Sequence, residues 1–146
     1  ALHHRSLTNE EKIYAFFRLF AILKQSKNAI SAKSVLPQDL YKIMDYIDCY
    51  IHEEITITDI AKALYISQST LERRFKEAFD MTPLEYIRKK KLVLAAQMLQ
   101  EGKSVLTAGT SVGYNDNSYF IKLFKHYYKI TPYQYKKNYN KNNKER

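Results

Sequence analysis

The chain contains an internal repeat, which limits the folds open to it. Two segments carry the same order of apolar, basic and turn-forming residues, 49 positions apart. The first copy contains Leu71, Arg73, Phe75, Lys76, Thr82, Pro83 and Tyr86. The second copy contains Phe120, Lys122, Phe124, Lys125, Thr131, Pro132 and Tyr135. The segments just before them align at an offset of 48, so one extra residue lies in the second turn. The repeat predicts two structural units of the same design.

Each unit has the spacing of helices, because its apolar residues recur three and four positions apart. A short helix, a tight turn and a longer helix are followed by a helix that opens on Thr-Pro. Thr82-Pro83-Leu84-Glu85 is a strong start signal, since it combines a cap, a favoured first-turn proline and a capping box. The helix it opens joins the two units and ends at Gly102. No strand pattern is present. The sequence predicts an all-α fold, preceded by an amphipathic helix at Thr8–Ser26.

A short helix, a turn of three or four residues and a second helix form a helix-turn-helix unit. The two helices cross where a small side chain is needed, and Ala61 and Gly109 occupy that position in the two units. Four residues later the chain must turn with a positive φ, which glycine adopts without strain. Gly113 meets this need in the second unit, whereas Tyr65 stands there in the first.

The outer face of each longer helix carries side chains that match the edges of bases. Arg and Lys can donate to guanine, Gln and Asn can pair with adenine, and Glu can accept from cytosine. The candidate base-contacting residues are Gln68, Ser69, Glu72, Arg73, Asn117, Ser118, Ile121 and Lys122. The candidate phosphate-contacting residues are Arg74, Lys76, Arg88, Lys89, Lys91 and Lys125. Any exposed helix face is polar, but two copies with matching caps and charges favour the binding interpretation.

The charge is unevenly distributed along the chain. Residues 1–81 hold 11 basic and 11 acidic residues, whereas residues 82–146 hold 13 basic and 4 acidic residues. Tyrosine is also enriched there, with 8 of the 13 residues. A basic, tyrosine-rich half indicates a polyanion as partner, and double-stranded DNA is the first candidate. An A·T-rich genome, which favours Lys, Asn and Tyr codons, is the alternative explanation of this composition.

Other classes of function find little support. The four histidines lie at scattered positions without metal-ligand spacing, and three glycines leave no glycine-rich phosphate loop, so we expect no metal, no cofactor and no enzyme. The single cysteine, Cys49, excludes a disulfide framework and favours a reducing, cytoplasmic compartment. The longest apolar run, Leu19 to Leu23, is far too short to cross a bilayer.

Residues 104–137 read SVLTAGTSVGYNDNSYFIKLFKHYYKITPYQYKK, with Gly-Tyr, Ser-Tyr-Phe, Phe-Lys and Thr-Pro-x-x-Tyr in that order. Residues 56–87 read TITDIAKALYISQSTLERRFKEAFDMTPLEYI and follow the same plan. On these motifs, residues 37–137 resemble the DNA-binding domain of AraC/XylS-type bacterial transcription regulators. The resemblance implies seven helices in two helix-turn-helix subdomains, joined by a long helix at residues 83–101. It also implies recognition helices in successive major grooves.

The family's base-contacting positions correspond here to Ser69, Glu72, Arg73, Asn117, Ser118, Ile121 and Lys122. The chain departs from the family at Ala108-Gly109, where Ile-Ala is usual. Both replacements are smaller, and glycine costs a helix about 1 kcal/mol relative to alanine, so the second unit is expected to be the looser one.

The resemblance divides the chain into three parts. Residues 1–36 are expected to end a sensor and dimerisation region. Residues 37–137 form the DNA-binding domain, with helix-turn-helix units at about 56–80 and 104–129, and residues 138–146 are expected to be a flexible basic tail. The chain has no initiator Met, so we expect it to be part of a longer regulator.

The implied function is sequence-specific regulation of transcription, commonly activation. RNA polymerase is a candidate partner, and the helix at Thr8–Ser26 is a candidate dimer contact; the alternative is that this helix packs on the DNA-binding domain. The competing functions are a helical nucleic-acid-binding accessory module and a protein-interaction domain, both without sequence specificity.

Overall fold

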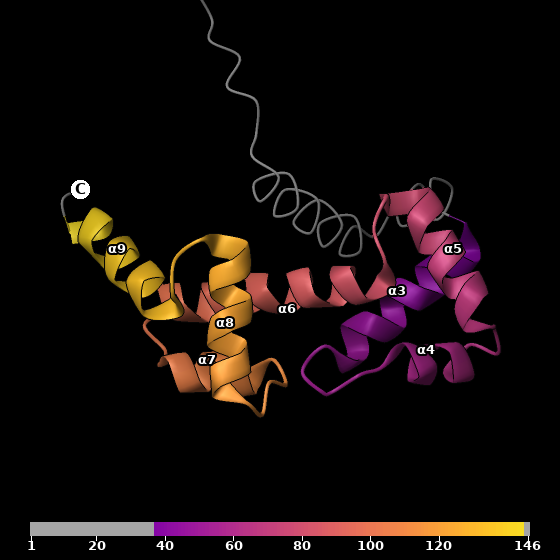
Figure 1. Ribbon diagram of the computed structural model, residues 1–146, viewed down its shortest axis with the longest axis horizontal. Coiled ribbons are helices and arrows are strands. Elements are labelled where there is room, and N and C mark those ends of the chain that lie inside the picture. Colours follow the sequence, from indigo (N-terminus) through magenta and orange to yellow (C-terminus); the bar gives the residue numbers. More distant parts are fainter. Residues whose placement is uncertain (1–36, 145–146) are drawn as a thin grey trace, which may run out of the picture. The chain divides into compact units, whose positions relative to one another are not determined.

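The computed structural model describes residues 37–144 of the chain. This part contains helices and no strands, which confirms the all-α prediction there (Figure 1). The helices are α3 (Gln38–Tyr50), α4 (Ile57–Ala63), α5 (Gln68–Phe79), α6 (Pro83–Gln100), α7 (Val105–Ser111), α8 (Asn117–Tyr128) and α9 (Pro132–Lys144). The chain divides into two units at Tyr41, and the second unit, Lys42–Arg146, contains both helix-turn-helix pairs. The helix expected at Thr8–Ser26 lies outside the described residues.

The starts of the helices follow the capping residues of the sequence. Thr82 precedes α6, and its hydroxyl accepts a hydrogen bond from the backbone N–H of Glu85 at 3.2 Å. The carboxylate of Glu85 accepts in return from the N–H of Thr82 at 2.9 Å. This backbone hydrogen bond lowers the pKa of Glu85. Thr56 and Asp59 form the same capping box at α4, so the local signals were sufficient to place both starts.

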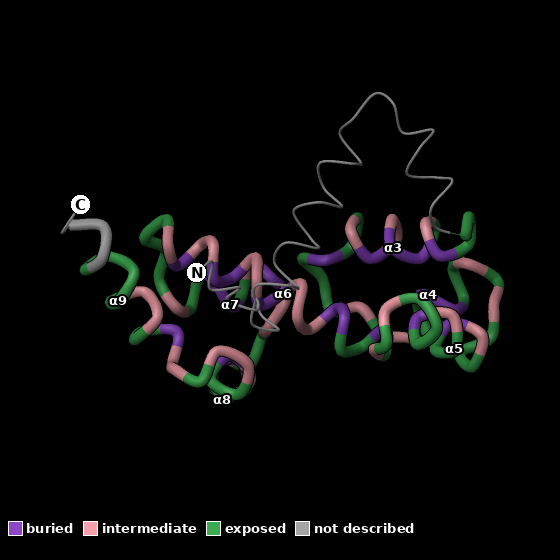
Figure 2. Tube along the Cα trace, turned by 90° about the horizontal axis from the view of Figure 1, so that it is seen from above, coloured by how far each residue is buried: buried purple, intermediate pink, exposed green. Residues whose placement is uncertain are grey.

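Helix α6 contributes to two separate cores. At its beginning, Tyr86 packs against Phe75 and Phe79 of α5, with ring centroids 5.3 and 5.7 Å apart. Further along, its apolar residues join α7 and α8 in one buried cluster (Figure 2). That cluster consists of Leu92, Ala95, Ala96, Leu99, Ala108, Val112, Phe120 and Phe124. One helix therefore supplies part of the core to each half, as expected of the joining helix.

The crossing of α7 and α8 explains the glycine at position 109. A Cβ atom on Gly109 would lie 2.8 Å from Cδ1 of Phe120, which is closer than packed carbons approach. The repeat places Ala61 and Leu71 at the corresponding positions of the first half. The second half thus combines a smaller residue on one helix with a larger residue on the other. Phe120 is completely buried, so the smaller residue leaves no looser core at this crossing.

The turns between α4 and α5 and between α7 and α8 have different residues at the position that needs a positive φ, as the comparison of the two repeats indicated. Gly113 has a φ of +81°, which glycine adopts readily. Tyr65 has a φ of 55° at the corresponding place, although a side chain strains this conformation. The side chain of Tyr65 is 96% exposed, so packing within the described residues does not compensate for the strain.

Replacing Tyr65 with glycine is expected to stabilise the protein. Relief of the left-handed strain, about 1–2 kcal/mol, exceeds the cost of about 0.4–1 kcal/mol from the larger freedom of glycine in the unfolded chain. We expect the free energy of unfolding to rise by roughly 0.5–1 kcal/mol in a denaturant titration. Tyr65→Ala is the matched control, because it removes the ring and keeps the strain. A gain with alanine as large as with glycine would contradict this explanation.

Helix α9 continues to Lys144, although the sequence predicted a flexible tail from residue 138. Its start is anchored, because Thr131 and Gln134 exchange hydrogen bonds of 2.9 and 3.2 Å. Lys136 adds two bonds, to the carbonyls of Gly102 and Lys103 at 2.7 and 2.9 Å. No glycine or proline follows Pro132. Once a helix is nucleated, each further residue extends it at little cost.

Candidate nucleic-acid interface

Helix α5 has one buried face and one solvent face. Leu71 and Phe75 are completely buried, and Ser67 caps the helix by accepting from the N–H of Thr70 at 3.1 Å. The four candidate base-contacting residues of this helix, Gln68, Ser69, Glu72 and Arg73, are all exposed. The buried stripe therefore holds α5 against the protein while its opposite face is accessible to a partner.

Helix α8 repeats this arrangement with one difference. Phe120 and Phe124 are completely buried, and Asp116 caps the helix by accepting from the N–H of Tyr119 at 3.0 Å. Ser118, Lys122 and Lys125 are exposed, as predicted. Asn117 and Ile121, however, are only half-exposed, and Ile121 packs against the second core.

Three of the candidate base-contacting side chains differ in how far their polar groups are already paired within the protein. The amide nitrogen of Gln68 donates to the hydroxyl of Thr58 in α4 at 2.7 Å, so part of its donor capacity is used within the protein. The guanidinium of Arg73 lies 3.3 Å from the carboxylate of Glu77, with both side chains more than 60% exposed. Such exposed ion pairs contribute little, and Arg73 can exchange this partner for another. The amide oxygen of Asn117 is buried and has no hydrogen-bond partner among the described residues.

The basic run at residues 88–91 divides between the surface and the interior. Arg88 and Lys89 are half-exposed. Lys90 forms a salt bridge with Asp48 of α3. Lys91 is only 5% exposed, and its ammonium donates to the carbonyl of Glu53 at 2.5 Å. Lys91 was predicted to contact phosphate, but it is buried, because its position on α6 turns it toward the first half of the protein.

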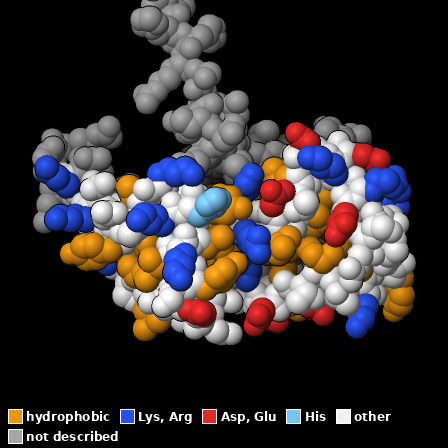
Figure 3. All heavy atoms as spheres, viewed as in Figure 1, with side chains coloured by type: hydrophobic (Ala, Val, Ile, Leu, Met, Phe, Trp, Pro, Cys, Tyr) orange, Lys and Arg blue, Asp and Glu red, His pale blue; other side chains and the backbone are white. Residues whose placement is uncertain are grey.

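In Figure 2, α8 is seen nearly end-on beside α6, and α5 lies near the beginning of α6, next to α4. Figure 3 shows that Lys and Arg side chains predominate over the end that carries α8 and α9, while most acidic side chains on this face lie over the other end. The basic excess of residues 82–146 thus lies around α8 and α9 on the face that Figure 3 shows.

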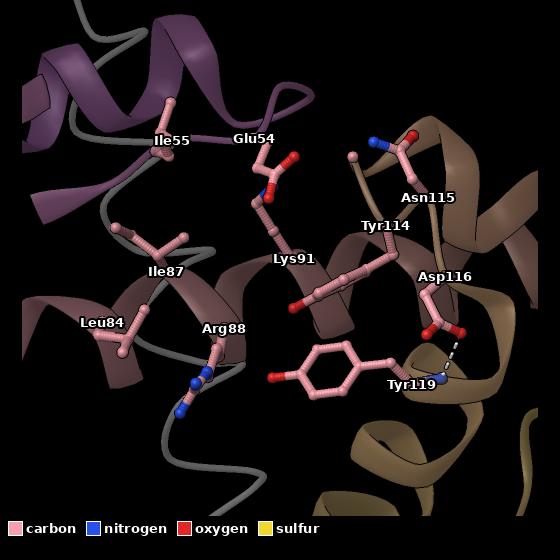
Figure 4. Close-up of a pocket in the computed structure, with 11 residues that line it drawn as sticks. Glu54, Ile55, Leu84, Ile87, Arg88, Lys91, Tyr114, Asn115, Asp116 and Tyr119 are labelled. Carbon is pink, nitrogen blue, oxygen red and sulfur yellow. Dashed lines mark hydrogen bonds between the residues drawn. The ribbon is translucent and has the colours of Figure 1, made fainter.

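A cavity of about 310 Å³ lies between the two halves, and no sequence motif predicted it (Figure 4). Glu54 and Ile55 approach it from the α3–α4 loop, Arg88 and Lys91 from α6, and residues 113–116 with Tyr119 from the second turn and α8. These segments are far apart in the sequence, so no local pattern could place them together. Tyr119, which is 43% exposed beside the candidate residue Ser118, is a surface residue that the prediction missed.

No helix within residues 37–144 combines the length and the apolar character needed to cross a membrane. In the same part of the chain, no group of three or more His, Cys, Asp or Glu side chains is placed to hold a metal ion.

Comparison with known proteins adds to this geometry. Residues 60–138 match a family described as "Helix-turn-helix domain". An uncharacterised helix-turn-helix-type transcriptional regulator of Bacillus subtilis is 36% identical over 97 residues, which cover 66% of this chain and 33% of that protein. The first curated relatives that match are much longer proteins, of which the chain covers between 33% and 48%.

Two solved structures have the same fold. A transcriptional regulator from Chromobacterium violaceum, described among AraC-type DNA-binding domain-containing proteins, superposes with a TM-score of 0.63 at 26% identity. The match covers 69% of this chain and 91% of that one. The DNA-binding domain of the global transcriptional factor AdpA, solved in complex with a target DNA, has a TM-score of 0.67 at 20% identity, over 71% of this chain and 95% of that one. At this identity the second match shows the fold alone.

Proposed function

The chain belongs to the family of AraC-type helix-turn-helix DNA-binding domains, and from this premise we propose that it reads a specific double-stranded DNA sequence as part of a transcription regulator. Helices α5 and α8 would enter successive major grooves from one side of the duplex. The outer side chains of α5 and α8 would contact base edges, and the neighbouring basic side chains would contact phosphates.

The observation that carries this proposal is the duplication of an exposed polar face on two buried-stripe helices. Each helix has two fully buried apolar residues one turn apart, which fix its orientation, and each presents serine and a basic residue to solvent. A single exposed helix face is ordinary, but two equivalent faces on repeated helix-turn-helix units suit the repeating groove of a duplex.

The two helices do not contribute equally to the proposed readout. Arg73 and Glu72 are exposed and can pair with guanine and cytosine, so α5 has the stronger readers. In α8, Ile121 packs against the core and can make only apolar contacts, and Lys122 is the one candidate base-contacting residue there with a charge. We infer that α5 provides more of the sequence discrimination and α8 more of the anchoring.

Selection of bound sites from random double-stranded DNA tests the proposal. A specific binder should enrich one motif with two parts about one helical turn apart, and should bind it at least ~10³-fold more tightly than random DNA. Failure to enrich any motif, together with retained binding of random DNA, would favour the alternative of a non-specific nucleic-acid-binding module. Absence of binding to any DNA would favour a protein-interaction domain.

Replacing Arg73 with alanine is expected to relax specificity at one base pair. A bidentate contact with guanine is worth about 1–3 kcal/mol of discrimination, so the preference for the selected base should fall by roughly 10- to 100-fold. Competition gel shifts with DNA changed at single positions measure this preference.

Lys125→Ala is the control, because Lys125 is exposed on α8 and is assigned to phosphate. Its loss should weaken cognate and random DNA alike and make the salt dependence shallower by about one unit of slope. If both variants lowered the affinity for cognate and random DNA by the same factor, the assignment of Arg73 to a base would be wrong.

The wider role of the protein extends the same proposal. Relatives of greater length are transcription regulators by name, among them the lactose operon transcription activator of Staphylococcus xylosus. We propose a cytoplasmic, non-catalytic regulator that acts as an activator, contacts RNA polymerase and pairs with a second copy through residues 1–36. Sedimentation of the chain with and without residues 1–36 tests the pairing, since only the longer form should dimerise.

A further inference from the structure

The two halves of the protein touch through their backbones beside α6. A Cβ atom on Gly113, in the α7–α8 turn, would lie 2.8 Å from the carbonyl oxygen of Glu53 and 2.9 Å from that of His52. Both carbonyls belong to the loop between α3 and α4. In the other direction, Nδ1 of His52 donates to the carbonyl of Ser111 at 2.8 Å. The approach is therefore close enough that only glycine fits at position 113.

Lys91 lies beneath this contact and is shared by both halves. Its ammonium donates to the carbonyl of Glu53 on one side and lies 5.5 Å from the ring centroid of Tyr114 on the other. Burial lowers the pKa of this ammonium, and the nearby Glu54 carboxylate opposes the effect. A cation over an aromatic ring is attracted to it, and the attraction grows as water is excluded. The buried charge is thus satisfied only while the loop and the turn stay together.

This contact does not belong to the outer faces of α5 and α8. His52, Glu53 and Ser111 lie outside both helices, and Lys91 is on α6. Figure 4 shows Lys91 between Glu54 and Tyr114, at the side of the cavity that separates the loop from the second turn. These residues therefore do not form the proposed DNA-contacting faces. Their contacts limit how far one half of the protein can rotate relative to the other about α6.

We propose that His52, Glu53, Lys91, Ser111 and Gly113 form a clasp that sets the spacing and orientation of α5 relative to α8, with Lys91 as its positioning residue. Long helices bend and twist, so α6 alone would leave this relation loosely defined. For a protein that reads two half-sites, the clasp then selects the separation between them. This last consequence rests on the proposed function, whereas the geometric part does not.

The geometric part is tested on the full chain without DNA. Ser69 and Ser118, exposed on α5 and α8, are replaced with cysteine and spin-labelled in a background in which the exposed Cys49 is serine. Pulsed electron resonance then gives the distribution of distances between the labels. We expect one narrow distribution for the parent, and a shifted or broadened one for Gly113→Ala and for Lys91→Met.

Gly102→Ala is the matched control. Gly102 has a φ of +90°, close to the +81° of Gly113, but nothing lies within 4 Å of the place where its Cβ would be. It therefore introduces the same backbone strain without a wedge in the clasp, and the distance distribution should stay that of the parent. Lys91→Met keeps the length of the side chain while it removes the charge, so it tests the clasp without steric overlap.

The DNA part uses the motif found by selection, with one base pair inserted between its two half-sites. The insertion increases the separation between the half-sites by about 3.4 Å and rotates one half-site relative to the other about the axis of the duplex. The parent and Gly102→Ala should lose at least about tenfold in affinity, since the protein or the DNA must deform. For Gly113→Ala and Lys91→Met, the insertion should lower the affinity by less than about fivefold, or the longer site should be preferred. The affinity of these variants for each half-site alone should be unchanged.

Identical distance distributions in all variants would overturn the clasp, as would a broad distribution in the parent. Changed distances with unaltered spacing preference would overturn its role in selecting half-site separation. If the parent bound no specific sequence but the distances changed as expected, the clasp would stand and the proposed function would fail.

Discussion

Phe124→Ala should open the second half of the protein while the first half stays folded. Phe124 is completely buried at the centre of its cluster, where it packs against Phe120, Tyr128 and Tyr135 with ring centroids 4.4 to 5.9 Å apart. Removal of such a ring costs about 3–5 kcal/mol, which is a large share of the stability of a small domain. Hydrogen exchange should show lost protection in residues 105–144 and retained protection in residues 42–79.

The repeat supplies the reciprocal variant. Phe75 occupies the corresponding position of the first half and is also completely buried. Phe75→Ala should therefore reverse the pattern and expose residues 57–79 first. Tyr133→Ala serves as the neutral control, since its side chain is 68% exposed. A single cooperative loss of protection across both halves in either core variant would contradict the presence of two separable cores.

Raising the salt concentration from 50 to 200 mM should weaken DNA binding by roughly 500-fold. Five basic side chains assigned to phosphates stay accessible once the buried Lys91 is set aside, namely Arg74, Lys76, Arg88, Lys89 and Lys125. Five neutralised phosphates give a slope of log affinity against log salt of about −4.5, because each contact releases condensed cations. Fluorescence anisotropy with labelled DNA at a series of salt concentrations measures this slope.

The same titration with the Lys125→Ala variant should give a slope shallower by about one unit. A slope shallower than about −2 for the parent would mean that the basic half of the chain does not face DNA. Substitution of glutamate for chloride separates anion effects from cation release, and the difference between the parent and Lys125→Ala should persist in both salts.

Local chemistry made most of the helices predictable. Thr82 caps α6 as expected, Thr56 and Ser67 are capping residues of the same kind at α4 and α5, and α6 ends beside Gly102. The internal repeat presents each capping and apolar pattern twice, so a helix that is weakly marked in one copy can be assigned from the other. The end of α9 was missed because no residue marks it, and its continuation depends on anchoring by Lys136 to carbonyls about 33 residues earlier.

The exposed residues of the candidate interface could be predicted from the sequence, but the buried contacts behind them could not. Which residues of α5 and α8 face solvent follows from their positions relative to the buried stripe, and Ser69, Arg73 and Lys122 are where that pattern places them. Lys91 could not be placed, because four consecutive basic residues on a helix point in four directions and only the tertiary fold decides which direction is buried. The contact between Gly113 and Glu53 joins residues 60 positions apart and leaves no local trace.

The crossing of α7 and α8 has a consequence for how such a protein can evolve. Gly109 and Phe120 share one volume, as Ala61 and Leu71 occupy the equivalent positions in the other half. A methyl group added at 109 overlaps the ring, and a smaller side chain at 120 leaves a void, so either change alone lowers fitness where both together are tolerated. We therefore expect substitutions at these two positions to be tolerated as a pair. The first half has Ala61 and Leu71 at the equivalent positions, a larger residue on one helix and a smaller one on the other, which is the kind of paired change that we expect.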